Sequence, residues 1–269
     1  MLLKLKQKAK IKSAKTRTAA ARGALCPMHL DMKLKIFFFF LMLFVFSCTS
    51  GKQRVEKFEA LKSFKETEPP KRFSDEWHIL NRSQHEFSVS VSNEKLQIIE
   101  AKHRTNVKLD IQNGTLLGID KCEWGGKLIF VPHDTSKPDV EIKLGNIKSI
   151  FWYKNNIYFL EGLAHLSMST GAMYRLNIFN NRFICIKVLD FEDAPEVCAV
   201  YQDKVFIASF QNFYEIKDFK KKLIFAETFW RSLYPNSIAV FDEENIFLGI
   251  RSGIVRLNLK KKEIKFYKD

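Results

Sequence analysis

Short runs of apolar or alternating residues dominate the chain from about residue 77 to its end. Clear examples are 86–92, 95–101, 147–153 and 245–250. Turn-forming pairs such as Asn113-Gly114 separate many of the runs, and no segment keeps a helical period over twelve or more residues. Short runs bounded by turn signals are typical of strands. The pattern therefore predicts an all-β domain over 77–269.

A repeat of about 40 residues narrows the choice of all-β fold. Equivalent positions in one strand of successive units are occupied by Tyr174, Tyr214 and Val255. Equivalent positions in the preceding strand are occupied by Ile157, Val205 and Ile246. We call these residues the markers of the repeat. The units agree in spacing once eight extra residues are assigned to a loop between 161 and 172. Units of this size with four short strands are typical of β-propeller blades. We expect a β-propeller of about five four-stranded blades, with a sandwich or an open barrel as the alternative.

Three segments carry a resemblance to known proteins. One segment, 245–259, resembles blades of bacterial sensor-type propellers; its sequence is Asn-Ile-Phe-Leu-Gly-Ile-Arg-Ser-Gly-Ile-Val-Arg-Leu-Asn-Leu. Together with Glu-Gly-Leu-Ala-His-Leu and Tyr-Pro-Asn-Ser it is similar to a family of uncharacterised bacterial propeller-like proteins, over most of 115–269. This resemblance implies the fold and no activity.

A secretory signal precedes the domain. After Met32 come two lysines, then eleven apolar residues at 36–46, then Ser47 and Cys48. This is the layout of a signal peptide over 32–47. Eleven residues span only about 16 Å as a helix, which is too short for the ~30 Å core of a bilayer.

The end of that signal resembles the lipobox of bacterial lipoproteins, in the sequence Val-Phe-Ser-Cys48. The resemblance implies that Cys48 is diacylated (the palmitate type of modification) and becomes the mature N-terminus. Two acyl chains anchor a protein stably to a membrane. An uncleaved N-terminal anchor is the alternative. We expect the domain to lie outside the cytoplasm, in the cell envelope.

The segments on either side of the signal differ in character. Residues 1–31 form a basic leader, which we interpret as the product of an upstream start codon, with Met32 the true start. A transit peptide or a nucleic-acid-binding tail is the alternative. Residues 48–76 contain the lipidated cysteine and a charged stretch with Pro69-Pro70, and we expect a flexible tether. A short helix before Pro69 fits the spacing of its apolar residues.

The formal net charge of +14 points to nucleic acid only at first sight. Residues 1–47 carry +9 of it, and the rest of the chain carries +5. A nucleic-acid footprint must belong to the folded domain. We therefore expect no nucleic-acid partner; the expected partners are the membrane, through the lipid anchor, and an unknown envelope protein or small ligand.

Two segments in the predicted loops carry candidate binding residues. The segment 161–171 holds the extra residues, and its Glu161 and His165 suit a proton-transfer pair or half of a metal site. The segment 122–126 holds Trp124 before two glycines, and an indole there offers a flat stacking surface. The alternatives are a packed loop and a β-turn with a packed tryptophan. Loops of adjacent blades lie side by side, so we expect both segments on one rim.

A third candidate is the segment with Tyr234, Pro235 and Asn236. It resembles the Pro-Asn element of propeller lactonases of the gluconolactonase kind, which implies an Asn that binds metal at the central channel. The remaining ligands of that family have no match in this sequence. The alternative is a turn in which Asn236 caps its own backbone. We expect Tyr234 and Asn236 to face the same rim as Trp124.

No catalytic constellation emerges from these residues. Cys122, Cys185 and Cys198 lack the spacing of a metal site, so neither a metal nor another cofactor is expected. The first hypothesis is a binding or scaffold module without catalysis. The alternatives are a propeller hydrolase or lactonase with a central metal, and a structural component of an envelope complex.

Overall fold

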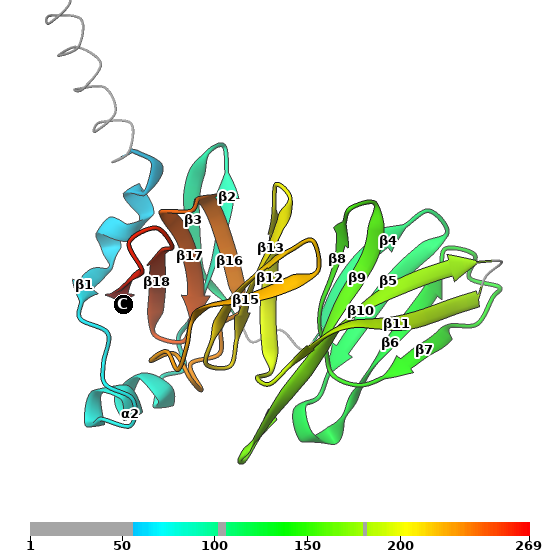
Figure 1. Cartoon of the computed structure of the whole chain (residues 1–269), viewed down its shortest axis with the longest axis horizontal. Coiled ribbons are helices and arrows are strands. Elements are labelled where there is room, and N and C mark those ends of the chain that lie inside the picture. The colour runs from blue at the N-terminus through cyan, green and yellow to red at the C-terminus, as the bar shows by residue number, and fades with distance from the viewer. Residues whose placement is uncertain (1–55, 102–105, 180–181) are drawn as a thin grey trace, which may run out of the picture. The chain divides into compact units, whose positions relative to one another are not determined.

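The structure, a computed structural model, describes residues 56–101, 106–179 and 182–269. The predicted basic leader, signal peptide and lipid-anchor cysteine lie outside these residues. Strands make up most of the described chain and form five antiparallel sheets (Figure 1). The predicted all-β class is confirmed. The sheets form neither a single closed barrel nor a pair stacked as a sandwich.

The sheets follow one another along the chain, and consecutive strands in each are hydrogen-bonded neighbours. The first sheet consists of β2 (Glu86–Ser92) and β3 (Lys95–Ala101). The second sheet consists of β4 (Asn106–Ile111), β5 (Gly114–Asp120), β6 (Gly126–Pro132) and β7 (Val140–Leu144). The third sheet consists of β8 (Ile147–Tyr153), β9 (Asn156–His165), β10 (Met168–Phe179) and β11 (Arg182–Phe191). The fourth sheet consists of β12 (Pro195–Tyr201), β13 (Lys204–Ser209), β14 (Phe213–Lys217) and β15 (Lys220–Phe225). The fifth sheet consists of β16 (Ser237–Asp242), β17 (Asn245–Ile250), β18 (Gly253–Asn258) and β19 (Glu263–Lys268), with β1 (Lys65–Thr67) beside β19.

The repeat in the sequence corresponds to one sheet per unit. In the third, fourth and fifth sheets, the marker of the third strand pairs with a residue of the second strand. That partner lies two positions after the second strand's own marker in every case. The pairs are Tyr174 with Phe159, Tyr214 with Ile207, and Val255 with Leu248. The third, fourth and fifth sheets are therefore built in the same register.

Four hydrophobic clusters hold neighbouring sheets together. One joins the second and third sheets through Leu116, Leu128 and Phe159, and the next joins the third and fourth sheets. A third cluster joins the fourth and fifth sheets. Because β17 is packed on both faces, all six of its residues are buried, which explains its unbroken apolar run.

The fourth cluster brings the two ends of the domain together. Val89 and Leu96 of the first sheet pack with Phe247 and Ile254 of the fifth. The first sheet thus packs on the last one rather than on the second, which follows it in the chain. Among the described residues, no hydrophobic cluster joins the first sheet to the second.

The strand count differs from the expected five four-stranded units. Three sheets have four strands, but the first has two and the fifth has five. The predicted strands did not include β1 and β4. β1 is only three residues long and forms no marked run. β4 does alternate apolar and polar residues, so the sequence carried a signal for it that the prediction overlooked.

The region expected to be a tether is ordered from about residue 58 onward. A 3₁₀ helix, η1 (Glu59–Ser63), buries Leu61 against the first and fifth sheets, and β1 pairs with β19. The short helix expected before Pro69 is therefore present as this 3₁₀ turn. The domain begins well before residue 77 because these residues complete an otherwise open face of the core.

A second helix, α2 (Asp75–Arg82), was not predicted. The Ser74 hydroxyl caps it by accepting a hydrogen bond from the Trp77 backbone N–H. Trp77 and Leu80 enter the cluster between the fourth and fifth sheets, and the indole N–H of Trp77 donates to the Phe229 carbonyl at 2.8 Å. Eight residues are too few for a periodic pattern to stand out in the sequence.

Candidate functional site

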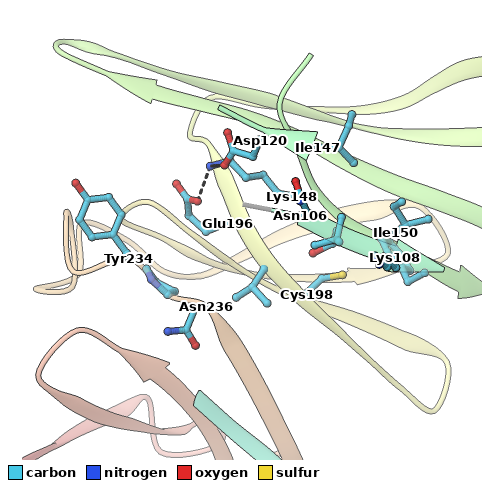
Figure 2. Close-up of a pocket in the computed structure, with 15 residues that line it drawn as sticks. Asn106, Lys108, Asp120, Ile147, Lys148, Ile150, Glu196, Cys198, Tyr234 and Asn236 are labelled. Atoms are coloured by element: carbon cyan, nitrogen blue, oxygen red, sulfur yellow. Dashed lines mark hydrogen bonds and ion pairs between the residues drawn. The ribbon is translucent and has the colours of Figure 1, made fainter. Parts of the chain in front are cut away.

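A cavity of about 600 Å³ lies where the first strands of several sheets approach one another. Its walls are formed by β4, β8, β12 and the segment that leads into β16. These elements come from the second, third, fourth and fifth sheets. We call this space the central cavity (Figure 2).

Three charged side chains meet in the central cavity. The ammonium nitrogen of Lys148 lies 2.7 Å from a carboxylate oxygen of Asp120 and 2.9 Å from one of Glu196. The three side chains are between 9% and 12% exposed, so solvent screens them little. Figure 2 shows the lysine between the two acids. We call Asp120, Lys148 and Glu196 the charge triad.

Burial and pairing act on these groups in opposite directions. Burial lowers the pKa of Lys148, but the carboxylates of Glu196 and Asp120 outweigh it and raise that pKa above its ordinary value. Burial raises the pKa of Glu196, and the ammonium group of Lys148 partly offsets this. At neutral pH Lys148 is therefore a firmly held cation, which is unsuited to act as a base.

Two β-bulges direct Lys148 and Glu196 of the triad into the cavity. The register between β8 and β9 shifts between Ile147 and Ser149, which places Lys148 at the irregularity. The register between β12 and β13 shifts in the same way between Pro195 and Val197, around Glu196. A bulge leaves one residue unpaired and turns its side chain out of the normal alternation.

A second cavity of about 460 Å³ adjoins the first, since Lys148, Glu196 and Tyr234 line both. Its other walls are the turns between the second and third strands of four sheets. Their contributions are Glu123 from the β5–β6 loop, His165 from β9–β10, Phe210 from β13–β14 and Arg251 from β17–β18. We call this second space the mouth. Four equivalent turns thus surround one end of the central cavity.

The loops expected on one rim lie side by side at the mouth. The imidazole of His165 is 3.7 Å from the carboxylate of Glu123, which directly precedes Trp124. Trp124 is 83% exposed and Leu166 is 88% exposed, more than any other large apolar side chain among the described residues. Trp124 is therefore available on the surface rather than packed in a turn.

Glu161 does not join His165. Its carboxylate pairs with the Lys143 ammonium at 2.6 Å and lies in a third cavity, which Tyr174 also lines and which shares Cys122 and Glu123 with the second. Burial raises the pKa of Tyr174 to about 12, and the charge of Glu161 adds to the rise. The expected proton-transfer pair is absent because both residues lie on β9, where four residues of extended chain span about 13 Å. The extra residues at 161–171 extend the β9–β10 hairpin instead of forming a loop.

Tyr234 and Asn236 approach the same cavities from the fifth sheet. The Tyr234 ring lies under the guanidinium of Arg251, 4.6 Å from its carbon to the ring centroid. The side-chain oxygen of Asn236 accepts hydrogen bonds from the hydroxyls of Ser88 (2.9 Å) and Ser237 (2.8 Å). Its side-chain nitrogen is buried and donates no hydrogen bond. Asn236 therefore joins the first and fifth sheets rather than capping its own backbone.

The donor set does not suit a central metal ion. The oxygen of Asn236 is already hydrogen-bonded, and the Lys148 ammonium occupies the space between the two carboxylates. Within the described chain, no group of three or more His, Cys, Asp or Glu side chains is placed to hold a metal. A divalent cation that prefers oxygen would need several free oxygen ligands.

The cysteines of the domain are free thiols. Cys198 lines the central cavity, and burial raises its pKa to about 12. Cys122 is exposed, and partial burial of its thiol followed by the charge of Asp120 raises its pKa. A thiol that stays protonated is a poor nucleophile. Cys198 is therefore not a nucleophile at neutral pH.

The charge triad was missed in the sequence, although a signal for it existed. Lys148 and Glu196 are 48 residues apart, the same spacing as Ile157 and Val205 in the repeat. They are thus equivalent residues of neighbouring units with opposite charge. Comparing charged positions between units, rather than apolar positions alone, would have singled them out.

The described residues contain no helix long and apolar enough to cross a membrane.

No protein-family model matches the chain, and no curated protein matches it. Among solved structures, the chain is similar to the tricorn protease, with a TM-score of 0.39 and 12% identity over 65% of the chain. The matched part is 19% of the tricorn protease, so the chain spans about a fifth of that protein's length. It is also similar to the computationally designed Ika8 protein, with a TM-score of 0.28 and 7% identity over 68% of this chain and 71% of that one. A third similar structure is the N-terminal domain of Nup159, with a TM-score of 0.25 and 10% identity over 65% of this chain and 57% of that one. Because all three TM-scores are low, the description of the fold rests on the sheets themselves.

Proposed function

We propose that the chain is a lipid-anchored protein of the bacterial cell envelope, and that its domain is a five-bladed β-propeller that binds a partner or small ligand without catalysis. Three features support the propeller. Apart from β1, each sheet is a consecutive meander. The repeat is in register in the third, fourth and fifth sheets, and the first strands of three sheets, with the segment that leads into β16, surround one cavity. The packing of the first sheet on the last is one of the contacts that a ring of blades requires, although no hydrophobic cluster of the described residues joins the first sheet to the second.

One observation supports the binding role above the others. The two most exposed large apolar side chains of the described residues, Trp124 and Leu166, lie on neighbouring loops that the Glu123–His165 contact joins. Exposed aromatic groups beside a concave site are typical of binding hot spots. We assign the binding face to Trp124, His165 and Tyr234 at the mouth, with Asn236 deeper in the central cavity.

The binding face can be tested with a double variant, Trp124→Ala with His165→Ala, in the full chain. We expect it to lose partners that the unaltered chain captures from a detergent extract of the envelope. Trp152→Ala is the matched control, since Trp152 is also exposed but lies at the other end of β8 from Lys148. Unchanged capture by a folded double variant would refute the assignment.

The anchor rests on the sequence Ser47-Cys48 and needs its own test. Cys48→Ala should abolish metabolic labelling with palmitate and release the protein from the membrane fraction. Cys122→Ala, which removes an exposed thiol of the domain, should leave both unchanged. Persistent labelling of the Cys48 variant would show that the anchor is elsewhere.

A metal-dependent hydrolase has less support as a second candidate. Carboxylates do converge on the central cavity, as such an enzyme would need, but Lys148 neutralises them. Elemental analysis of the purified chain distinguishes the two functions. A stoichiometric divalent metal lost in the variant Asp120→Asn would favour the hydrolase.

A further inference from the structure

The central cavity and the mouth form one continuous space, because Lys148, Glu196 and Tyr234 line both. Together they have the size of a site for a small molecule rather than for a protein segment. Polar side chains from four sheets line this space, so a ligand inside it would contact every sheet except the first directly.

Apart from Lys108, the described charged side chains around this space are already paired. In the central cavity, Lys148 is bound to both carboxylates of the charge triad. At the mouth, His165 contacts Glu123, and Arg251 is held by Glu86 at 2.9 Å and by the Asn81 carbonyl at 2.8 Å. Among the described lining residues, the one further charged side chain is that of Lys108, which is exposed on β4.

This pairing disfavours a charged ligand. An anion beside Lys148 would also lie beside the carboxylates of Asp120 and Glu196, which repel it. A cation would have to displace the ammonium of Lys148 from two short contacts. An uncharged ligand avoids both penalties and can still use the remaining lone pairs of the carboxylates.

Asn236 shows what such a ligand must offer. The residue lines the central cavity; its side-chain nitrogen is buried and has no hydrogen-bond acceptor among the described residues, while its oxygen accepts from Ser88 and Ser237. Buried polar groups are almost always hydrogen-bonded, so an amide left in this state needs a partner. The ligand must therefore carry a neutral oxygen that accepts from Asn236 and hydrogens that donate to the triad carboxylates.

A hydroxyl group does both at once, and rings bearing several hydroxyls also have apolar faces that pack on aromatic side chains. Tyr234 inside the site and Trp124 beside the mouth offer such surfaces. We propose that the central cavity and mouth bind an uncharged polyhydroxylated ligand of the sugar class. A hydroxyl oxygen of the ligand accepts from Asn236, and ligand hydroxyls donate to Asp120 and Glu196. This inference rests on the proposed binding function and names its ligand class.

Isothermal titration calorimetry of the full chain in detergent tests the class directly. The probes are the neutral sugars glucose, galactose, mannose and N-acetylglucosamine, with glucosamine and glucuronate as a cation and an anion of nearly the same size. At least one neutral sugar should bind at least tenfold more tightly than both charged analogues. Tighter or equal binding of either charged analogue, or no heat with any neutral sugar, would overturn the proposal. This comparison uses the unaltered protein, so it does not depend on a variant that folds.

The variant Asn236→Asp then locates the sugar. It keeps an oxygen for Ser88 and Ser237 but removes the N–H donors, so the affinity for the best neutral sugar should fall at least tenfold. Asn113→Asp, in the turn between β4 and β5, is the matched control and should bind normally. Unchanged affinity in a folded Asn236 variant would refute the site. Binding of glucuronate alone would refute the ligand class without contradicting the binding function. The capture experiment with the Trp124 and His165 variant tests the binding function separately.

Discussion

The ammonium nitrogen of Lys148 lies 2.9 Å from a carboxylate oxygen of Glu196, so an ion pair joins the first strands of the third and fourth sheets. Asp120 adds a contact from the second sheet. The lysine therefore holds three sheets together at the wall of the central cavity. Because all three groups are nearly buried, water stabilises the charges of Asp120 and Glu196 only weakly, and both carboxylates depend on the lysine.

Removing the lysine should be costly. Lys148→Met leaves two nearly buried carboxylates without their counterion, and loss of one partner from a buried pair costs about 3–5 kcal/mol. Lys154→Met is the matched control, since Lys154 pairs with Asp218 on the surface and such pairs contribute only about 0–1 kcal/mol. Urea unfolding of both variants measures the difference. Equal losses in the two would show that the triad does not stabilise the fold.

The contribution of Lys148 should also depend on pH in a defined direction. Its pKa is raised in the folded chain above the ordinary value of 10.5, so the folded state keeps the proton longer than the unfolded state does. The stabilisation is therefore fully present below that value and is lost as the pH rises through the folded-state pKa. The stability difference between the unaltered chain and Lys148→Met should be constant from about pH 7 to 9 and shrink above about pH 11. A difference that grows at alkaline pH would contradict the raised pKa.

The apolar pattern predicted most strands well because each sheet buries at least one face. Strands β2, β3, β8 and β17 begin and end where the sequence placed them. Pattern reasoning failed where structure depends on distant partners. β1 forms because β19 offers a free edge, and α2 is retained because Trp77 and Leu80 fill the cluster between two sheets.

The candidate site was predictable in part for the same reason. Trp124 and His165 lie near each other because equivalent turns of adjacent sheets meet, which the repeat implies. Glu161 was misplaced because the extra residues were assigned to a loop, whereas they continue the β9–β10 hairpin. The charge triad depends on β-bulges at Lys148 and Glu196, and no local pattern in the sequence marks a bulge.

The packing of the first sheet on the fifth can be tested at Gly249. A Cβ atom there would collide with the carbonyl oxygen of Phe87 and with Ser88. Overpacking of this kind costs about 1–3 kcal/mol. Gly249→Ala should lower stability by that amount and raise hydrogen exchange across β2 and β3. The surface change Ser92→Ala should do neither; normal exchange in folded Gly249→Ala would argue against this contact.

The free cysteines of the domain should differ sharply in reactivity. Burial raises the pKa of Cys198 to about 12, so only about one thiol in ten thousand is ionised near pH 8. Cys122 is exposed and should react first with iodoacetamide in the native chain. Cys198 should react only after unfolding in urea, as peptide mapping by mass spectrometry would show. Equal rates in the native state would contradict the raised pKa of Cys198.

The last prediction concerns where the domain begins. Leu61 is buried in the cluster of the first and fifth sheets, and Phe58 and Phe64 pack against the same cluster. Removing a buried leucine side chain costs about 2–5 kcal/mol, and loss of the half-buried Phe58 and Phe64 adds to it. Whole domains are stable by only about 5–15 kcal/mol, so a fragment that starts at residue 77 should lose most of its stability. Its unfolding midpoint in urea should fall far below that of 56–269, while its far-UV circular dichroism still shows strands.

A point variant separates this effect from the mere loss of chain length. In the full chain, Leu61→Ala should lower stability by about 2–4 kcal/mol, because it leaves a cavity between η1 and two sheets. The neighbouring Lys62 is exposed, so Lys62→Ala should change stability by less than about 0.5 kcal/mol. If 77–269 unfolds at the same urea concentration as 56–269 and Leu61→Ala matches Lys62→Ala, then residues 58–67 form no part of the core, and the domain needs no residue before Trp77.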